Sequence, residues 1–128
     1  MRIVNFLSGM VLVFAWVAIL LFTLWVASAS AASAGDPGKG KDIYTKSCAS
    51  CHGPAGKGDG VAAAALNPKP ANLADKATIS KLDDATLTNV IAKGGPAVGK
   101  SPLMPPFNGQ LKDQDVKDVI AYVRSLAK

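Results

Sequence analysis

Both cysteines and the single histidine of this 128-residue chain stand within five consecutive positions, as Cys48, Cys51 and His52. Side chains at positions i, i+3 and i+4 of a helical turn share one face, so two thiols and an imidazole would point the same way. Three kinds of chemistry use such residues. They are a structural zinc site, a Cys-x-x-Cys redox pair and the covalent attachment of haem.

The rest of the chain favours haem attachment. A structural zinc site needs about four ligands, and the sequence has only these three cysteine and histidine residues. A redox pair normally accompanies a βαβ pattern, which is missing from the sequence, and it would leave His52 without a role. Two thiols on one side of a turn can bond to two vinyl groups of a porphyrin while the imidazole reaches the iron. Cys48 and Cys51 are therefore predicted to attach one haem c through thioether bonds, with His52 as the proximal ligand.

An iron held on one face by His52 needs a ligand on the other. No second histidine exists, and Met104 is the only methionine outside the N-terminal apolar segment. It stands in the stretch SPLMPPFNG, where Pro105 favours an extended conformation for the residue before it. Methionine in a small core is usually soft filler, and a lysine, Asn108 or an open position are alternatives as the sixth ligand. Met104 is the predicted distal ligand.

Three amphipathic helices are predicted to surround this site. The first covers residues 36–48, with Asp36 as the N-cap and Pro37 in the first turn. The second covers residues 82–95 and the third residues 111–128, both with apolar residues at helical spacing. No segment has the pattern of a regular strand. The predicted fold class is therefore all-α.

The segments between the helices are predicted to be irregular. Residues 53–60 are a glycine-rich loop directly after the motif, and residues 61–73 allow a helical turn only before Pro68 and Pro70. Residues 94–109 form a long loop with four prolines. A loop of that length in so small a domain is either functional or disordered, and its apolar centre indicates that it packs against something.

An apolar segment precedes this domain. Residues 1–26 contain an apolar run from Ile3 to Val26, which as a helix would span roughly 36 Å and so cross a bilayer core. The Ala/Ser-rich residues 27–35 offer small-x-small sites for a signal peptidase, or would serve as a tether behind an uncleaved anchor. Both interpretations place residues 36–128 outside the cytoplasm.

These motifs together resemble the class I c-type cytochromes, specifically the small single-haem bacterial type. The resemblance covers about Asp36 to Lys128. It rests on GKDIYTKSCASCHGPAGKGDG, NPKPANL, LMPPFNGQL and DVIAYVRSL, in that order. It implies the cytochrome c fold, with three to four helices around one covalently bound haem, here preceded by an N-terminal hydrophobic signal or anchor helix. It also implies thioether bonds from both cysteines and axial ligation by His52 and Met104.

The resemblance implies a close crossing of the first and last helices, with Gly40 and Tyr44 facing Ala121 and Tyr122. One departure from the family pattern lies at the start of the last helix. Family members often place Ser or Thr at the N-cap, where Lys112 stands here, so the exact first residue of the helix is left open.

Supporting residues around the iron are also implied. A backbone carbonyl in the region of Pro68 or Pro70 is expected to accept a hydrogen bond from the Nδ1–H of His52, which fixes the tautomer of the ring. Phe107 belongs to the apolar part of the Met104 loop, and Tyr44 to the helix crossing.

With both axial positions filled, substrate chemistry at the iron is blocked. The prediction is therefore not an enzyme but a one-electron carrier of a respiratory or related periplasmic electron-transfer chain. The alternatives are a haem-based ligand sensor or a peroxidase-like enzyme with a labile Met104, and a thioredoxin-like thiol oxidoreductase. The expected location is the periplasmic side of the bacterial inner membrane, either N-terminally anchored or soluble after cleavage.

The expected partners are redox proteins, either a membrane oxidoreductase complex or a periplasmic dehydrogenase. The N-terminal helix would add contact with the membrane if it is not cleaved, and no nucleic-acid motif is present. The formal net charge is +5. Lysines would steer docking on an acidic partner, although they fit a solvated surface equally well.

Overall fold

The computed structural model describes residues 34–127. Within that range the chain is helical, and pairing between strands is limited to one isolated bridge between Asn108 and Leu111. In chain order the elements are α2 (Pro37–Ser47), α3 (Ala49–His52), the 3-10 turn η1 (Ala63–Ala65), α4 (Lys76–Ile79), α5 (Asp84–Lys93), the 3-10 turn η2 (Gly95–Val98) and α6 (Asp113–Leu126). The predicted all-α class is confirmed for these residues.

The predicted N-terminal apolar helix and most of the Ala/Ser-rich segment fall on residues 1–33, outside the described residues, as does Lys128. Among residues 34–127, none of the helices combines the length and the apolar character that crossing a membrane requires.

Helix α2 begins where it was predicted to begin, because its first turn carries two helix-start signals. The Asp36 carboxylate accepts hydrogen bonds from the N–H groups of Gly38 at 2.8 Å and Lys39 at 3.3 Å. Pro37 occupies the first helical position, where no N–H is needed. The helix ends at Ser47 with Cys48 as its C-cap, and so leads directly into the Cys-x-x-Cys-His motif.

Helix α6 supplies most of the buried core. Its N-cap is Lys112, whose side chain is no hydrogen-bond acceptor. Instead the carboxylate of Asp115 in the first turn accepts the N–H of Lys112 at 2.9 Å. Acidic residues at this end also suit the helix dipole. The buried side chains of α6 repeat at helical spacing and include Val116, Val119, Ile120 and Val123.

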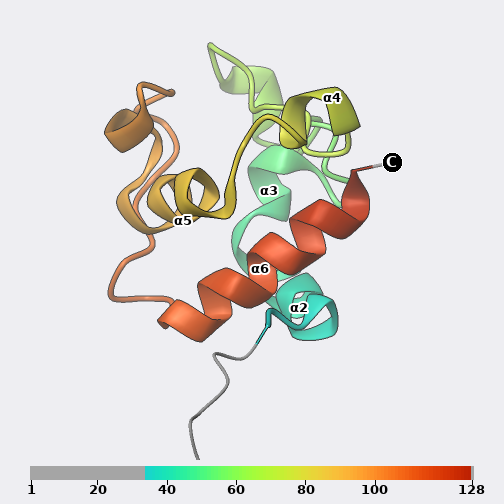
Figure 1. Cartoon of the computed structure of the whole chain (residues 1–128). Coiled ribbons are helices and arrows are strands. Elements are labelled where there is room, and N and C mark those ends of the chain that lie inside the picture. The colour runs from blue at the N-terminus through green and yellow to red at the C-terminus, as the bar shows by residue number, and fades with distance from the viewer. Residues whose placement is uncertain (1–33, 128) are drawn as a thin grey trace, which may run out of the picture. The chain divides into compact units, whose positions relative to one another are not determined.

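Helices α2 and α6 cross at close range, as the resemblance implied (Figure 1). Gly40 lies so near α6 that a Cβ on it would be 1.9 Å from the carbonyl oxygen of Asp118. Beside it the rings of Tyr44 and Tyr122 pack edge to face, with centroids 5.2 Å apart. Tyr44 is only 1% exposed, so this crossing is part of the core.

A buried carboxylate fastens the start of the domain to α6. Asp118, 3% exposed, accepts hydrogen bonds from the N–H of Asp36 at 2.8 Å and from Nε2 of Gln114 at 2.9 Å. These two donors, the Asp36 N–H above all, hold the pKa of Asp118 below the ordinary aspartate range. Gly35 packs on the same helix, where a Cβ would lie 2.9 Å from that of Ala121.

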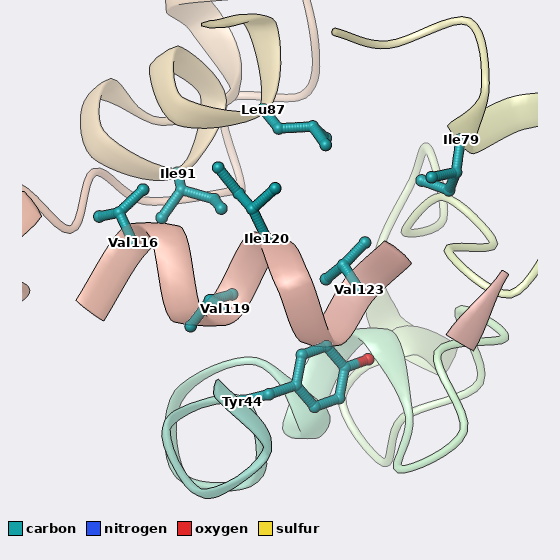
Figure 2. Packing of buried hydrophobic residues seen from close by; sticks show 8 residues of the cluster. All are labelled: Tyr44, Ile79, Leu87, Ile91, Val116, Val119, Ile120 and Val123. Atoms are coloured by element: carbon teal, nitrogen blue, oxygen red, sulfur yellow. The ribbon is translucent and has the colours of Figure 1, made fainter. Parts of the chain in front are cut away.

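Helix α5 packs on the side of α6 opposite α2 (Figure 2). The Asp83 carboxylate caps it by accepting the N–H of Thr86 at 2.8 Å. Figure 2 shows Leu87 and Ile91 pointing from α5 toward α6, and both side chains are buried. The apolar stripe predicted for this helix therefore forms the second half of the core.

One arginine joins α6 to the start of α5. The guanidinium of Arg124 donates to the carbonyl oxygens of Ile79 at 3.0 Å and Leu82 at 2.6 Å. It also pairs with the carboxylate of Asp84 at 2.7 Å. The three contacts tie the segment between α4 and α5 to the last helix.

Two short elements clarify the segments predicted as irregular. The helical turn allowed within residues 61–73 is present as η1. Helix α4 was not predicted, and it forms because the carboxylate of Asp75 accepts the N–H of Ala77 at 3.1 Å and the hydroxyl of Thr78. Its last residue, Ile79, is buried in the core, so tertiary packing stabilises a helix too short to form alone.

Candidate haem site

The Cys-x-x-Cys-His motif forms one helical turn directly after α2. The N–H groups of Cys51 and His52 both donate to the carbonyl of Cys48, at 3.2 and 2.9 Å. Both thiols are free and half-buried. The turn therefore has the i, i+3, i+4 arrangement that the sequence predicted for two thiols and an imidazole.

The carbonyl groups at the end of this turn are all bound by donors from elsewhere. The carbonyl of Ser50 accepts the N–H of Ala62 at 2.9 Å, and the carbonyl of Cys51 accepts the N–H of Gly60 at 3.2 Å. The carbonyl of His52 accepts the N–H of Gly58 at 2.8 Å, and the carbonyl of Gly53 accepts the hydroxyl of Tyr44 at 2.8 Å. The last carbonyls of a helix lack partners within the helix. Here the glycine-rich loop, Ala62 shortly after it and the buried tyrosine supply them, which fixes the motif in place.

The imidazole of His52 is oriented by a main-chain carbonyl. Its Nδ1 lies 3.2 Å from the carbonyl oxygen of Ala71, which accepts a hydrogen bond when Nδ1 carries the proton. Burial lowers the pKa of His52, and the bond to Ala71 offsets this only in part. The ring is therefore neutral at neutral pH, with Nε2 left as the nitrogen for a metal.

The residues named from the sequence for this carbonyl require a correction. The group that faces His52 belongs to Ala71, not to Pro68 or Pro70. Pro68 is exposed and follows a cis peptide bond, whereas Pro70 is half-buried and directly precedes Ala71. The region was right, but the path of the loop selects the next residue.

Burial also acts on the first cysteine of the motif. It raises the pKa of the Cys48 thiol to about 11, with a smaller contribution from the neighbouring Cys51. Cys48 is therefore protonated at neutral pH in the protein without haem. Its side chain packs against the apolar core rather than pairing with a cation.

Met104 lies half-buried against the same core cluster as Cys48, although the two are far apart in the sequence. Its carbonyl accepts the N–H of Gly95 at 3.0 Å, and its N–H donates to the carbonyl of Ser101 at 3.3 Å. The loop also approaches Gly94, where a Cβ would be 2.8 Å from the carbonyl oxygen of Met104. Two consecutive glycines thus hold the backbone of this methionine.

The loop continues from Met104 back to α5. The N–H groups of Phe107 and Asn108 donate to the carbonyls of Ile91 and Ala92, at 3.1 and 2.9 Å. Phe107 is half-buried against the core, whereas Asn108 is exposed. The long proline-rich loop is therefore ordered by main-chain bonds to the last turn of α5.

This set of residues fits a covalently bound haem. It offers two free thiols on one turn, an imidazole whose Nδ1 is already engaged, and a thioether beside the same apolar cluster. Within residues 34–127, no three or more His, Cys, Asp or Glu side chains gather into a group that could bind a metal ion by themselves. The fold and these donors define a helical domain built around haem.

Comparison with known proteins assigns the family. Residues 38–127 match the family described as Cytochrome c, and the chain belongs to that family. The chain is 36% identical over 99 residues to cytochrome c-554(547) of Halothiobacillus neapolitanus, an alignment covering 73% of this chain and 99% of that protein. Haem c, covalently attached, is thus the cofactor, and electron transfer is the function of the family.

Other relatives are parts of larger assemblies. The chain is 33% identical over 91 residues to the cbb3-type cytochrome c oxidase subunit FixP of Bradyrhizobium diazoefficiens, covering 71% of this chain and 28% of that subunit. The chain thus spans less than a third of this relative. Among solved structures, the KustC0563 c-type cytochrome has a TM-score of 0.57 at 26% identity, over 70% of this chain and 98% of that one.

The groups that hold His52 and Met104 in place were not predicted from the sequence. Besides the Ala71 carbonyl, these are Gly58 and Gly60 on the histidine side and Gly94 and Gly95 on the methionine side. The sequence does contain a signal for these groups, namely glycine-rich stretches near His52 and Met104. What each glycine approaches depends on segments that are distant in the sequence.

Proposed function

We propose that Cys48 and Cys51 form the two thioether bonds to haem, with His52 and Met104 as the axial ligands of the iron. The observation that carries this proposal is the orientation of His52 by Ala71, because a ring held through Nδ1 presents Nε2 to a metal. The packing of Met104 and Cys48 on one apolar cluster supports the distal assignment.

The proposed function is one-electron transfer. When bound, haem c supplies a couple between Fe(III) and Fe(II). An iron held by both His52 and Met104 would have no open position for a substrate. The thioether of Met104 favours the reduced state and raises the reduction potential.

We further propose that this electron carrier works in a respiratory or related periplasmic chain. Relatives named as subunits of cbb3-type oxidases and as the cytochrome c subunit of a gluconate 2-dehydrogenase support redox partners of two kinds, a membrane oxidase or a periplasmic dehydrogenase. The exposed lysines, with a formal net charge of +5 for the chain, would favour an acidic partner. A reduction rate that falls as salt is added would support this charge steering.

The proposed domain organisation is an anchor or signal segment at residues 1–26, a tether or cleavage region at residues 27–35 and the haem domain at residues 36–128. It places the haem domain on the periplasmic side of the inner membrane. The intact mass of the purified holoprotein, or its N-terminal sequence, distinguishes an uncleaved anchor from a removed signal peptide.

Absorption spectroscopy of the holoprotein tests the proposed ligands. The pyridine haemochrome should show two thioether bonds, and the ferric protein should show the weak far-red band of methionine-bound iron. High-spin ferric iron, or rapid binding of carbon monoxide to the reduced protein, would instead favour a ligand sensor or a peroxidase-like enzyme with labile Met104. A chain recovered without haem would favour a thiol oxidoreductase.

A further inference from the structure

Gly58, in the glycine-rich loop after the motif, lies directly against the segment that orients His52. A Cβ on Gly58 would be 2.4 Å from the carbonyl oxygen of Pro70 and 3.4 Å from that of Ala71. The backbone φ at this residue is +76°, a conformation that side-chain-bearing residues rarely adopt. The absence of a side chain therefore sets how closely residues 70–71 approach the loop.

The same residue is bound to the main chain of the histidine. The N–H of Gly58 donates to the carbonyl of His52 at 2.8 Å. Gly58 thus contacts both partners of the hydrogen bond between His52 and Ala71. It is bonded to the main chain of His52 and lies against residues 70–71. A shift of Gly58 would change the distance between His52 Nδ1 and Ala71 O.

A second glycine holds the other end of the acceptor segment. The carbonyl of Gly56 accepts the N–H groups of Leu73 at 2.6 Å and Ala74 at 3.2 Å. Its φ is +74°, and a Cβ there would be 2.9 Å from a terminal methyl group of Leu126, the end of a flexible side chain. The segment that carries Ala71 therefore contacts the loop at Gly58 on one side and at Gly56 on the other, and the approach at Gly58 is the closer.

We propose that Gly58 is a positioning residue for the iron ligand: by setting the approach of the Ala71 carbonyl to His52 Nδ1, it tunes the reduction potential. The proposal rests on the proposed function, since it requires His52 to bind the iron. A carbonyl that accepts the Nδ1–H raises the basicity of the imidazole as a ligand. A more basic ligand stabilises Fe(III), so a longer hydrogen bond should raise the potential.

The test compares three substitutions in the holoprotein. Gly58→Ala should lengthen the distance from His52 Nδ1 to the Ala71 carbonyl oxygen, because its Cβ would press on residues 70–71. Gly56→Ala should have a smaller effect, because its Cβ would meet a flexible Leu126 methyl group and reach the acceptor segment only at Leu73, at 3.4 Å. Gly109→Ala is the matched control, because its φ is +84° and no atom lies within 4 Å of its Cβ position. All three add a methyl group at a positive φ, but only Gly58→Ala brings that group into close contact with residues 70–71.

Two measurements read the hydrogen bond directly. One is the reduction potential, and the other is the NMR shift of the His52 Nδ1–H in the reduced protein. We expect Gly58→Ala to raise the potential and move the Nδ1–H signal upfield, Gly56→Ala to follow with smaller shifts, and Gly109→Ala to match the wild type. Unchanged potential and unchanged Nδ1–H signal in Gly58→Ala, or equal shifts in the Gly109→Ala control, would overturn the proposal.

If Gly58→Ala yields no holoprotein, Gly58→Asn takes its place with Gly109→Asn as its control, because asparagine tolerates a positive φ better than alanine does. A shift in both measurements supports the positioning role, and the absence of both overturns it. The spectrum of the wild-type protein separates this question from the proposed function. Ferric wild type without histidine–methionine ligation would contradict the proposed ligands, whereas normal ligation with unresponsive variants contradicts only the role of Gly58.

Discussion

The two sides of the proposed iron site are held in different ways. On the histidine side, His52 lies in a turn whose final carbonyls are bound by four outside donors, and its ring is bound as well. On the methionine side, the described hydrogen bonds of Met104 are main-chain bonds within its own loop, to Gly95 and Ser101. The position of His52 is therefore fixed by bonds to both its ring and the main chain of its turn. The position of Met104 depends on how its loop is attached to α5.

Loss of one proposed thioether bond should have the largest effect, because that bond attaches the haem to the rigid histidine side. Cys48→Ala is expected to lose most of the stable holoprotein, measured as covalent haem per chain after purification. Thr45→Ala is the control, since this side chain is exposed on α2 and its hydroxyl donates to the Lys41 carbonyl of the same helix. Full yield of wild-type-like haemoprotein from Cys48→Ala would contradict the attachment.

Removal of the proposed distal ligand should leave the histidine side intact. Met104→Ala is expected to retain covalent haem and to lower the reduction potential substantially, within the range of about 0.8 V that axial ligands span. Its neighbour Leu103 is half-exposed, so Leu103→Ala should keep the wild-type potential. An unchanged potential in Met104→Ala would mean that another residue binds the iron.

A substitution at Gly94 should disturb the methionine side and leave the histidine side unchanged. At Gly94 φ is +81° and a Cβ would be 2.8 Å from the Met104 carbonyl oxygen and 3.0 Å from the nitrogen of Pro106. Gly94→Ala should therefore weaken the far-red band of methionine-bound iron while covalent haem stays complete.

Gly99 provides the comparison in the same loop. Its φ is +68°, yet no atom lies within 4 Å of its Cβ position. Gly99→Ala should cost roughly 1–2 kcal/mol of unfolding free energy from backbone strain and leave the band unchanged. Equal loss of the band in Gly94→Ala and Gly99→Ala would show that strain alone, rather than contact with Met104, is responsible.

The smallest effect is expected at a carboxylate that belongs to neither side. The lowered pKa of Asp118 means that its ionised form stabilises the fold. This contribution is complete above the ordinary aspartate pKa and is lost as pH falls through the lowered value. The difference in unfolding free energy between wild type and Asp118→Asn should thus shrink in acid, measured by denaturant titration at several pH values. A difference that stays constant with pH would contradict it.

The three long helices were predictable because their signals are local. Asp36 caps α2 as predicted, Asp83 caps α5, and Lys112 precedes α6. Apolar residues at helical spacing then identified the faces that became the core. Helix α4 was not predicted because it is a single turn, and its stability comes from burying Ile79.

The acceptor for His52 was not predictable to the residue. Pro68, Pro70 and Ala71 all lie in one loop, and each offers a carbonyl. Only the contact of Gly58 with residues 70–71 and the bonds of Gly56 to the following residues decide which one meets the ring. Such contacts join segments that no periodicity or capping rule connects.

The sequence by itself determined the chemistry. Two thiols and an imidazole on one turn, with one methionine in a distant loop, allow few cofactors, because ligand type and helical spacing are local properties. Only the folded chain shows how firmly each proposed ligand is held. That depends on close approaches between loops, such as Gly58 against Pro70 and Gly94 against Met104, where the absence of a side chain matters only once the partner segment is in place.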